Sequence, residues 1–352
     1  MKKRILVAPL NWGIGHACRC IPIINTLLKL KFNVVIASDG EALLLLQKEF
    51  PNLESTELPS YNVTYSESRK KFKTHLLKQL PKIQKVIKAE YKATQQIIID
   101  FKIDGIISDN RLGVYSSTIY SVFVTHQLKV LSGSTTWLSS FFHNRFIKKF
   151  NECWIPDFEN SPNLSGILSH FSSIKVKTPT RFIGGLSRFQ PSKIKHKYAI
   201  MVLLSGPEPQ RTLLEEKLLV ELNKCSRPVL FVQGKIEINQ KTERLKNITT
   251  INFLTSKGLE IALNESDLII CRSGYTSIMD LAKLQKKAFF IPTPGQSEQE
   301  YLAKHIETQN IAPFCNQDIF TLEQLAKVEN YSGFKNLPFK EDLAEELFSC
   351  FI

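Results

Sequence analysis

The sequence predicts an α/β protein built from two doubly wound parallel sheets that face each other across a cleft. The chain has 352 residues, which is too long for one ordinary core and suits two domains of roughly 150–200 residues. Its composition, 43% hydrophobic and 22% charged, is typical of a folded soluble protein. In both halves short apolar runs alternate with amphipathic helical patterns, as in parallel sheets covered by helices on both faces.

The first half, residues 1–190, supplies one such sheet. Its short apolar runs predict strands at Ile5–Leu10, Asn33–Ala37, Asp104–Ser108 and Ser121–Thr125. Amphipathic patterns predict helices at Cys20–Leu30, starting near Pro22, and at Gly40–Phe50. We expect this half to hold the acceptor of a reaction carried out in the cleft.

The second half, residues 191–352, repeats the pattern after a hinge at Gly184-Gly185 and Gln190–Lys193. Its predicted strands are Tyr198–Leu204, Pro228–Gln233, Thr249–Phe253, Asp267–Cys271 and Ala288–Ile291. Its predicted helices are Thr212–Leu222, Leu259–Leu263 and Thr276–Leu284. The last helix is expected either to stay with this domain or to pack back on the first. In open sheets of this kind, ligands bind beyond the carboxyl ends of the strands.

Net charge and cysteine usage limit the classes of partner. The net charge of +13 attracts anions such as nucleic acid, acidic membranes or phosphorylated small molecules, and no RNA-recognition or zinc-finger spacing is present. We therefore expect no specific nucleic-acid partner. Seven scattered cysteines without CxxC spacing fit reduced thiols in a cytoplasmic protein.

Two segments bear on membranes. The apolar run after Met1–Arg4 is too short for a signal peptide, and no stretch reaches the roughly 18 uncharged residues needed to span a bilayer. The segment Arg69–Lys92 carries nine Lys/Arg and one acidic residue, on a predicted helix pair broken at Pro81. A solvated basic face is the favoured interpretation, and an anionic membrane surface at the inner membrane face is the alternative.

The first turn that suggests chemistry follows the first strand. Gly13 and Gly15 permit a tight turn, and a helix N-terminus supplies backbone N–H groups. The pattern lacks the third glycine of a dinucleotide fingerprint, which disfavours a Rossmann dehydrogenase. His16 stands at the turn, where a neutral imidazole can accept a proton from a hydroxyl nucleophile near pH 7. From the spacing alone, a local cap is an equally good interpretation of His16.

The second turn, Arg272-Ser273-Gly274, again joins a strand to a helix and predicts an anion site suited to a diphosphate. Asp280 lies two helical turns further on, where a carboxylate suits a ribose diol, although a solvent-facing role is the simpler alternative. The segment Ile291–Glu300 is a polar loop rich in amides and carboxylates that suit sugar hydroxyls. It also fits a helix start with Ser297 as the cap and Glu300 at its third position. The loop Ser205–Arg211 is a further candidate anion nest, without the ending of a P-loop.

Taken in order, these motifs resemble the family 28 glycosyltransferases, a GT-B fold group that includes a lipid-linked N-acetylglucosaminyl transferase of peptidoglycan synthesis and galactolipid synthases. The resemblance is strongest over residues 253–303. The family's donor-binding motif is matched by Arg272-Ser273-Gly274, Thr276/Ser277 and Asp280, where the family usually has Glu. It implies that these residues bind uridine diphosphate. Further donor contacts implied by the resemblance and the loops are Arg188, Ser205, Gly206, Arg211, Phe253, Leu254, Gln296, Gln299 and Glu300. Glu300 replaces a family glutamine, and with the changed loop at Ser205 this suggests a separate branch.

The resemblance implies an inverting transfer of a hexose or N-acetylhexosamine from a uridine diphosphate sugar to a glycan or lipid-linked acceptor. His16 is the implied base, with Arg188, Arg272 or Arg211 as counter-charges for the leaving diphosphate. We expect neither metal nor cofactor, because the nearest acidic motif, Asp157-Phe158-Glu159, looks like a loop. Two alternatives remain. A nucleotide-sugar epimerase of the same fold needs cleft carboxylates, for which Asp109 and Glu298 are the candidates, and a non-catalytic binder would retain only the donor site.

Overall fold

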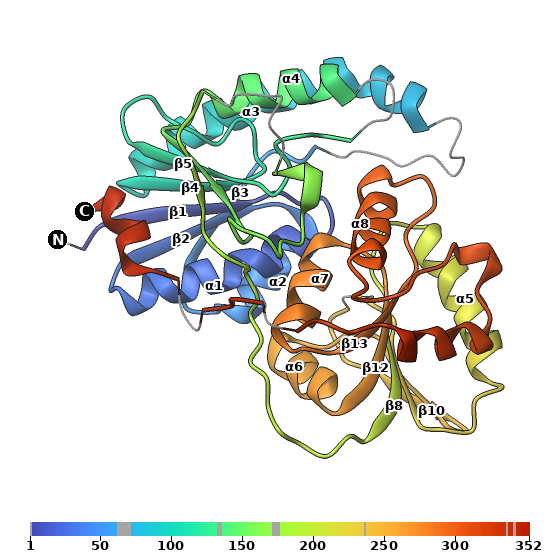
Figure 1. The fold of residues 1–352 in the computed structure, drawn as a ribbon. Coiled ribbons are helices and arrows are strands. Elements are labelled where there is room, and N and C mark those ends of the chain that lie inside the picture. The colour runs from blue at the N-terminus through green and yellow to red at the C-terminus, as the bar shows by residue number, and fades with distance from the viewer. Residues whose placement is uncertain are drawn as a thin grey trace. The chain divides into compact units, whose positions relative to one another are not determined.

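The computed structural model describes residues 2–61, 72–131, 136–170, 177–235, 237–335, 337–340 and 343–352. The chain divides into two compact units. Of the described residues, unit 1 contains those up to Ser187 together with those from Pro338 to Ile352, and unit 2 contains those from Arg188 to Leu337. Each unit is built on its own sheet, shown in Figure 1, and the predicted α/β class with two doubly wound sheets is confirmed.

The sheet of unit 1 has seven strands in the order β3-β2-β1-β4-β5-β6-β7, and all neighbours run parallel. The chain starts in the middle of the sheet, builds outward to one edge and then crosses to the other, as a doubly wound fold does. The strands are β1 (Arg4–Pro9), β2 (Asn33–Ser38), β3 (Glu54–Glu57), β4 (Gly105–Asp109), β5 (Tyr120–Val124), β6 (Glu152–Ile155) and β7 (Thr180–Phe182).

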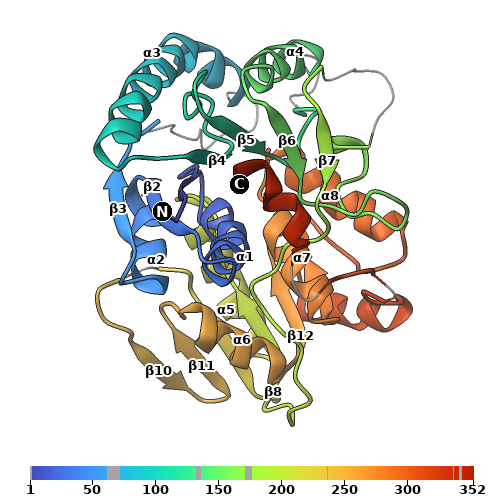
Figure 2. The same cartoon turned by 90° about the vertical axis from the view of Figure 1, so that its left-hand side faces the viewer.

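Helices cover both faces of this sheet. Figure 2 shows α1 (Gly15–Lys29) and α2 (Gly40–Glu49) on one face, with α3 (Phe72–Asp100) and α4 (Thr136–Ile147) on the other. Alternate residues of β1 serve the two cores, because side chains of a strand point to opposite faces. Ile5 and Val7 pack in the core with α1, whereas Leu6 and Ala8 pack in the core with α3. This two-sided burial explains why the strands are continuously apolar in sequence.

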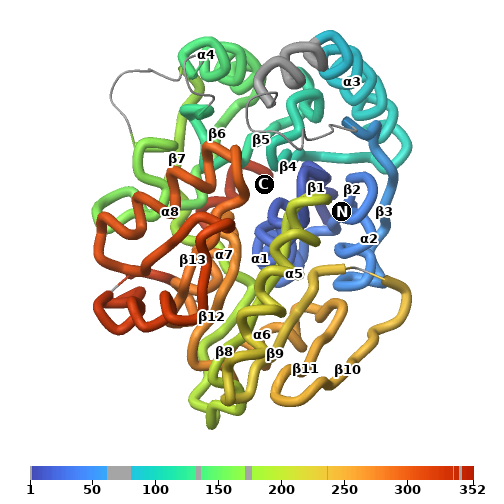
Figure 3. Tube along the Cα trace, turned by 90° about the vertical axis from the view of Figure 1, so that its right-hand side faces the viewer, coloured from blue at the N-terminus to red at the C-terminus, as the bar shows by residue number. Residues whose placement is uncertain are grey.

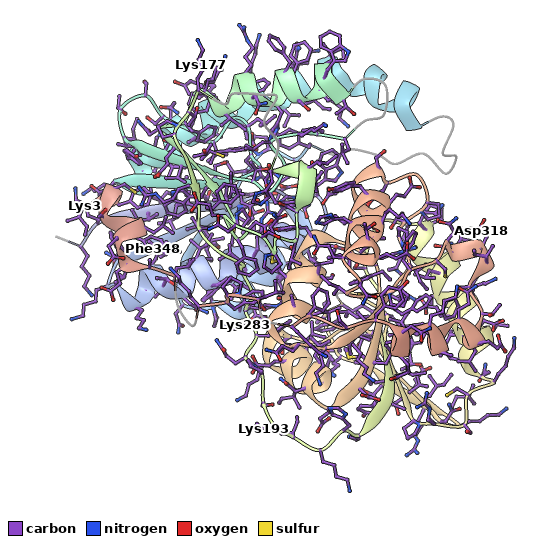
Figure 4. All side chains as sticks on the ribbon, viewed as in Figure 1. Lys3, Lys177, Lys193, Lys283, Asp318 and Phe348 are labelled. Atoms are coloured by element: carbon purple, nitrogen blue, oxygen red, sulfur yellow. The ribbon has the colours of Figure 1, made fainter. Side chains whose placement is uncertain are left out.

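The end of the chain completes unit 1 rather than unit 2. The short 3-10 helix η5 (Glu345–Phe351) brings two aromatic rings onto the core beside α1. Phe348, labelled in Figure 4, lies 5.5 Å from the ring of Trp154, and Phe351 lies 6.0 Å from that of Tyr120. A second 3-10 turn, η2 (Gly166–Leu168), follows β6.

The sheet of unit 2 has six strands in the order β10-β11-β9-β8-β12-β13, parallel except for the β10–β11 pair. Figure 3 shows this sheet from the side of α5, with β10 at one edge. The strands are β8 (Tyr198–Leu203), β9 (Val229–Val232), β10 (Thr242–Leu245), β11 (Ile248–Ile251), β12 (Ser266–Cys271) and β13 (Lys287–Phe290). The helices are α5 (Gln210–Leu222), α6 (Ser256–Asn264), α7 (Tyr275–Lys283), α8 (Ser297–Thr308), η3 (Gln317–Ile319) and η4 (Leu322–Asn330).

Two local predictions were wrong, and four strands, β3, β6, β7 and β10, were not predicted. The first helix starts at Gly15 rather than near Pro22, so that His16 lies in its first turn. The predicted break at Pro81 is absent, and α3 continues through it to Asp100. A proline inside a helix costs about 3 kcal/mol, and burying apolar side chains such as Ile87 and Ile97 offsets a loss of that order. The edge strand β10 was missed because all four of its residues are exposed and form no apolar run.

No helix among the described residues is long and apolar enough to cross a bilayer. Part of the basic segment Arg69–Lys92 lies outside the described residues. In its described part, Lys82, Lys85, Lys88 and Lys92 are exposed, whereas Glu90 is fully buried.

Candidate active site

The turn after β1 places His16 at the carboxyl edge of the unit 1 sheet. Gly13 adopts a φ of +81°, a backbone conformation that costs other residues energy. Two hydrogen bonds fix the residues that lead into the turn. The side chain of Asn11 donates to Asp39 at 3.1 Å, and buried Arg111 donates to the carbonyl of Pro9 at 2.9 Å. His16 therefore extends from a fixed turn, with 14% of its side chain exposed.

Asp109 is the partner of His16. It is the last residue of β4, which lies next to β1 in the sheet, so its fully buried carboxylate reaches the first turn of α1. The His16 Nδ1 atom lies 2.8 Å from Asp109 Oδ1. When the carboxylate accepts a hydrogen bond from Nδ1–H, the Nε2 atom keeps its lone pair. This is the arrangement of a general base oriented by a carboxylate.

Arg19 and His126 extend this pair. The guanidinium of Arg19 donates through Nε and Nη2 to the two oxygens of Asp109, and its Nη1 lies 2.7 Å from His126 Nδ1. Burial alone would raise the pKa of Asp109, but the charge of Arg19 and the contact with His16 lower it to about 2. Asp109 is thus an anion at neutral pH.

The sequence did not reveal this cluster. The sequence suggests Asp109 only as a carboxylate for epimerase chemistry, and it does not distinguish Arg19 or His126 from other polar residues. The available signal was the position of Asp109 and His126 at or just after strand ends, since strand ends of a parallel sheet meet at one edge. This position identifies the cluster only once the strand order is known, because the order places β4 between β1 and β5.

In unit 2, three neighbouring strands, β8, β12 and β13, end beside one another. Their loops hold Gly206, Ser273 and Thr293. Gly206 adopts a φ of +107°, and a Cβ placed there would lie 3.8 Å from the hydroxyl of Thr293. That hydroxyl is buried and has no hydrogen-bond partner among the described residues. A buried hydroxyl without a partner costs stability and suggests a site that a ligand completes.

Helix α7 begins directly after Ser273-Gly274. Gly274 is its N-cap, with extended backbone and no side-chain cap, so the positive end of the helix is not offset by an acid in the first turn. Thr276 and Ser277 are half-buried in that first turn. The fully buried hydroxyl of Ser273 donates to the carbonyl of Gln299 at 2.8 Å, which joins this turn to the start of α8.

Asp280 lies further along α7 and is 8% exposed. Its charge contributes, after burial, to raising the pKa of the buried Cys271 thiol to about 12. The predicted arrangement, in which the Asp280 carboxylate meets a ribose diol, stays a prediction.

Arg272 is buried inside unit 2, with 1% of its surface exposed. Its guanidinium donates to the carbonyls of Ile291 and Pro292 at 3.1 Å and, through Nη2, to the carbonyl of Gln210 and the side chain of Gln317, both at 2.8 Å. Burial lowers its pKa to about 10, which leaves it charged at neutral pH. Arg272 therefore ties the loop after β13 to the start of α5.

Arg211 is held by two acids. It donates to Glu208 at 2.7 Å through Nε and to Glu215 at 2.6 Å through Nη1. Burial acts to lower the pKa of Arg211, but its hydrogen bonds with Glu215 and Glu208 raise it overall. Its charge is thus balanced within the loop that contains Ser205 and Gly206.

Polar side chains at the start of α8 hydrogen-bond to the backbone of the loop after β13 and fix its conformation. The side chain of Gln299 accepts the N–H of Thr293 at 2.8 Å, and that of Glu300 accepts the N–H of Gly295 at 3.1 Å. The predicted cap was wrong by one residue: Gln296 is the N-cap, and α8 begins at Ser297. The backbone of Gln296 takes the extended conformation of a cap, which leaves Ser297 as the first helical residue.

The other predicted donor residues are half-buried and lie in loops of unit 2. Phe253 and Leu254 follow β11, and Arg188 lies near the start of the unit, with its guanidinium 4.8 Å from the ring of Phe189. Glu298 lies in the first turn of α8. Of the predicted residues, the structure brings together those on the loops after β8, β12 and β13.

The acidic motif at Asp157 organises a loop. Its buried carboxylate accepts the N–H groups of Phe158 and Ser165, both at 2.8 Å, whereas Glu159 is exposed. In the described part of the chain, no three His, Cys, Asp or Glu side chains gather as a metal site.

Comparison of the sequence with known families concerns mainly unit 2. Residues 210–338 match the glycosyltransferase family 28 C-terminal domain. This range contains the loop at Ser273, the loop after β13 and Asp280, but neither Arg188 nor the loop at Gly206.

Sequence relatives carry one name, UDP-N-acetylglucosamine–N-acetylmuramyl-(pentapeptide) pyrophosphoryl-undecaprenol N-acetylglucosamine transferase. The Buchnera aphidicola protein is 29% identical over 28% of this chain and 28% of its own length, and that of Francisella tularensis is 24% identical over 59% and 62%. The Alkaliphilus metalliredigens protein is 23% identical over 92% of this chain and 88% of its own length. The chain thus spans less than two thirds of the first two relatives.

Solved structures share the fold over nearly the whole chain. The glycotransferase of kitacinnamycin superposes with a TM-score of 0.63 at 12% identity, covering 93% of this chain and 89% of that structure. Acinetobacter baumannii MurG gives 0.54 at 15% identity, covering 94% and 91%. At such identities the likeness establishes the fold alone, a GT-B arrangement of two Rossmann-like domains.

Proposed function

We propose that the chain is a member of glycosyltransferase family 28, whose C-terminal domain residues 210–338 match, and that it transfers a hexose or N-acetylhexosamine from a uridine diphosphate sugar to an acceptor hydroxyl. The observation that carries the proposal is the turn at Ser273-Gly274. It lies within the matched residues, and it starts α7 with a helix N-terminus free of acidic side chains. Such an N-terminus favours a diphosphate.

We propose that the donor diphosphate lies against the first turn of α7. Arg272 and Arg211 are already engaged, one with carbonyl groups and the other with Glu208 and Glu215. Neutral groups therefore supply most of the binding: the helix dipole, Thr276, Ser277 and the Thr293 hydroxyl. Arg188 is the remaining candidate for a counter-charge.

In the reaction, His16 takes the proton of the acceptor hydroxyl on its Nε2 atom as the oxygen attacks the anomeric carbon. Asp109 holds Nδ1–H and stabilises the imidazolium that forms. The bond between the anomeric carbon and the diphosphate oxygen breaks, and the charge developing on that oxygen is stabilised by the α7 dipole. A single direct displacement inverts the anomeric centre, and this mechanism assigns no step to a metal ion.

The acceptor proposed is a lipid-linked glycan, as the names of the relatives suggest for those proteins. The exposed surface of unit 1 supports a peripheral membrane location. On α4, the side chains of Trp137, Phe141 and Phe142 are 70%, 57% and 48% exposed. Exposed cations flank them at Arg145, Lys148 and Lys149, and α3, on the same face of the sheet, adds its exposed lysines. Aromatic rings beside cations suit the interface of an anionic bilayer.

Two experiments test the proposal. Nucleotides and nucleotide sugars are first screened by thermal shift, where a ligand of the native state raises the melting temperature. Uridine diphosphate and its sugars are expected to raise it, and no shift with any of them would remove the donor site as proposed. Transfer from UDP-N-acetylglucosamine is then measured with a polyprenyl-linked acceptor, and the anomeric configuration of the product is read by NMR.

Incubation of the donor without acceptor separates the epimerase alternative. An epimer of the sugar nucleotide would favour that class, and the position of Asp109 disfavours it, since this carboxylate is engaged with Arg19 and His16.

Cosedimentation with vesicles tests the membrane surface. Substitution of Trp137 and Phe141 by Ser is expected to release the protein from anionic vesicles, whereas Ile238→Ser, at a 93% exposed residue of unit 2, serves as the control.

A further inference from the structure

Arg19 lies three residues after His16 on α1, so both side chains leave the same side of the helix. Arg19 is nearly fully buried, and its guanidinium contacts both oxygens of Asp109. A buried guanidinium paired through two donors with one carboxylate is a strong and geometrically defined interaction. It fixes the orientation of the carboxylate that faces His16.

The side chains of His16 and Arg19 both contact one atom, Asp109 Oδ1. His16 Nδ1 lies 2.8 Å from Asp109 Oδ1 and 2.9 Å from Arg19 Nη2, and Nη2 itself donates to that same oxygen. A guanidinium has only donors, and a carboxylate oxygen can accept two hydrogen bonds. Unlike His126, His16 Nδ1 is also in contact with the carboxylate oxygen to which Nη2 donates. Oδ1 then accepts from both nitrogens when the imidazole proton is on Nδ1, and the 2.9 Å between Nη2 and Nδ1 separates two donors to one acceptor.

We propose that Arg19 is a positioning residue that acts on His16 through Asp109. This inference rests on the proposed function, in which His16 is the base. Arg19 has two effects there. It aims Oδ1 at Nδ1, which selects the tautomer with an open Nε2, and it cancels the charge of Asp109. A buried carboxylate without that counter-charge would favour the imidazolium form, which cannot accept a proton.

The remaining titratable groups that face the cluster are uncharged at neutral pH. His126 Nδ1 accepts from Arg19 Nη1 at 2.7 Å, so that nitrogen carries no proton. Burial raises the pKa of the Cys20 thiol, whose sulfur lies 3.7 Å from Asp109 Oδ2 beside Cys18. Burial likewise lowers the pKa of His143, next to His126, to about 4. Arg19 and Asp109 therefore set the charge around His16.

The test is nitrogen-15 NMR of the histidine side chains in the full chain, with His16→Gln to assign the resonance. In the wild type at pH 7.5 we expect the tautomer protonated at Nδ1. Arg19→Met, which removes the charge, is expected to keep His16 protonated to roughly one pH unit higher or more. Arg19→Lys keeps the charge and is expected to stay near the wild type. Arg181→Met removes an exposed cation of unit 1 that pairs with Glu152 and is the matched control.

The activity profile gives a second readout. The acid limb of kcat/KM against pH should move upward in Arg19→Met by the same amount as the NMR midpoint. A folded Arg19→Met with an unmoved midpoint overturns the proposal, because a purely structural role would leave protonation unchanged. If Arg19→Met does not fold, a wild type protonated at Nε2 at pH 7.5 overturns it. A correct tautomer without any binding of uridine diphosphate in calorimetry would instead reject the donor proposal and leave this one standing.

Discussion

Asp109→Asn tests the core of the unit 1 site, because it changes charge with almost no change in shape. Asparagine retains an oxygen and a nitrogen at the positions of the two carboxylate oxygens. Asparagine has no negative charge and only one acceptor oxygen, so its NH2 group would face an N–H donor, either Arg19 Nε or His16 Nδ1 together with Arg19 Nη2. The variant should therefore lose both stability and turnover.

The stability loss follows from the pKa of Asp109, which is about 2 against an ordinary value of 3.8. At about 1.4 kcal/mol per pH unit, the ionised carboxylate contributes about 2–3 kcal/mol to the free energy of unfolding at pH 7. Since the folded value lies below the unfolded one, this contribution is complete above about pH 4 and disappears as the pH falls towards 2. The difference between the wild type and the variant should shrink over the same range.

Denaturant unfolding followed by tryptophan fluorescence measures this directly, because the three tryptophans, Trp12, Trp137 and Trp154, all lie in unit 1. We expect Asp109→Asn to lower the free energy of unfolding by about 3 kcal/mol at pH 7, since the buried Arg19 also loses its counter-charge. Turnover should fall by about two to four orders of magnitude, with the Kd for uridine diphosphate unchanged.

The matched control is Asp157→Asn. Asp157 is another buried carboxylate of unit 1 whose pKa is lowered: burial acts to raise it, and hydrogen bonds from His170 and Ser165 more than offset this. Its carboxylate contacts Leu164, Ser165 and His170 rather than His16, so this variant should lose stability but retain turnover. Wild-type turnover in Asp109→Asn, or an equal loss of turnover in both variants, would refute the assignment of Asp109 as the orienting acid.

Three further predictions concern the proposed site. His16→Ala should lower kcat by about 10²–10⁴-fold, while calorimetry finds the Kd for uridine diphosphate unchanged. Full activity in this variant would refute the assignment of His16 as the base. Asp280→Ala should weaken that Kd by about tenfold through loss of hydrogen bonds to the ribose, with Glu216→Ala, at an exposed residue of α5, as the control. Arg272→Met should lower the free energy of unfolding of unit 2 by more than about 3 kcal/mol, as followed by circular dichroism, because it removes four hydrogen bonds made by a buried guanidinium. A stable variant that fails to bind the nucleotide would show that Arg272 acts on the ligand instead.

The sequence by itself determined the elements that carry the fold. Strands buried on both faces are continuous apolar runs, so β1, β8 and β12 were predicted to within one residue at each end. The turns at His16 and Ser273 were also visible, because a glycine-containing turn between a strand and a helix is a local pattern. Exposed edge strands such as β10 left no comparable signal.

Only the tertiary structure decided what the charged side chains do. Arg272 and Arg211 looked alike in sequence as counter-charges, yet one is buried among carbonyl groups and the other is neutralised by two acids. Asp109 became the partner of His16 because β4 lies beside β1, although the two residues are 93 positions apart. Pairing of this kind depends on strand order and burial, which a linear pattern of residues does not contain.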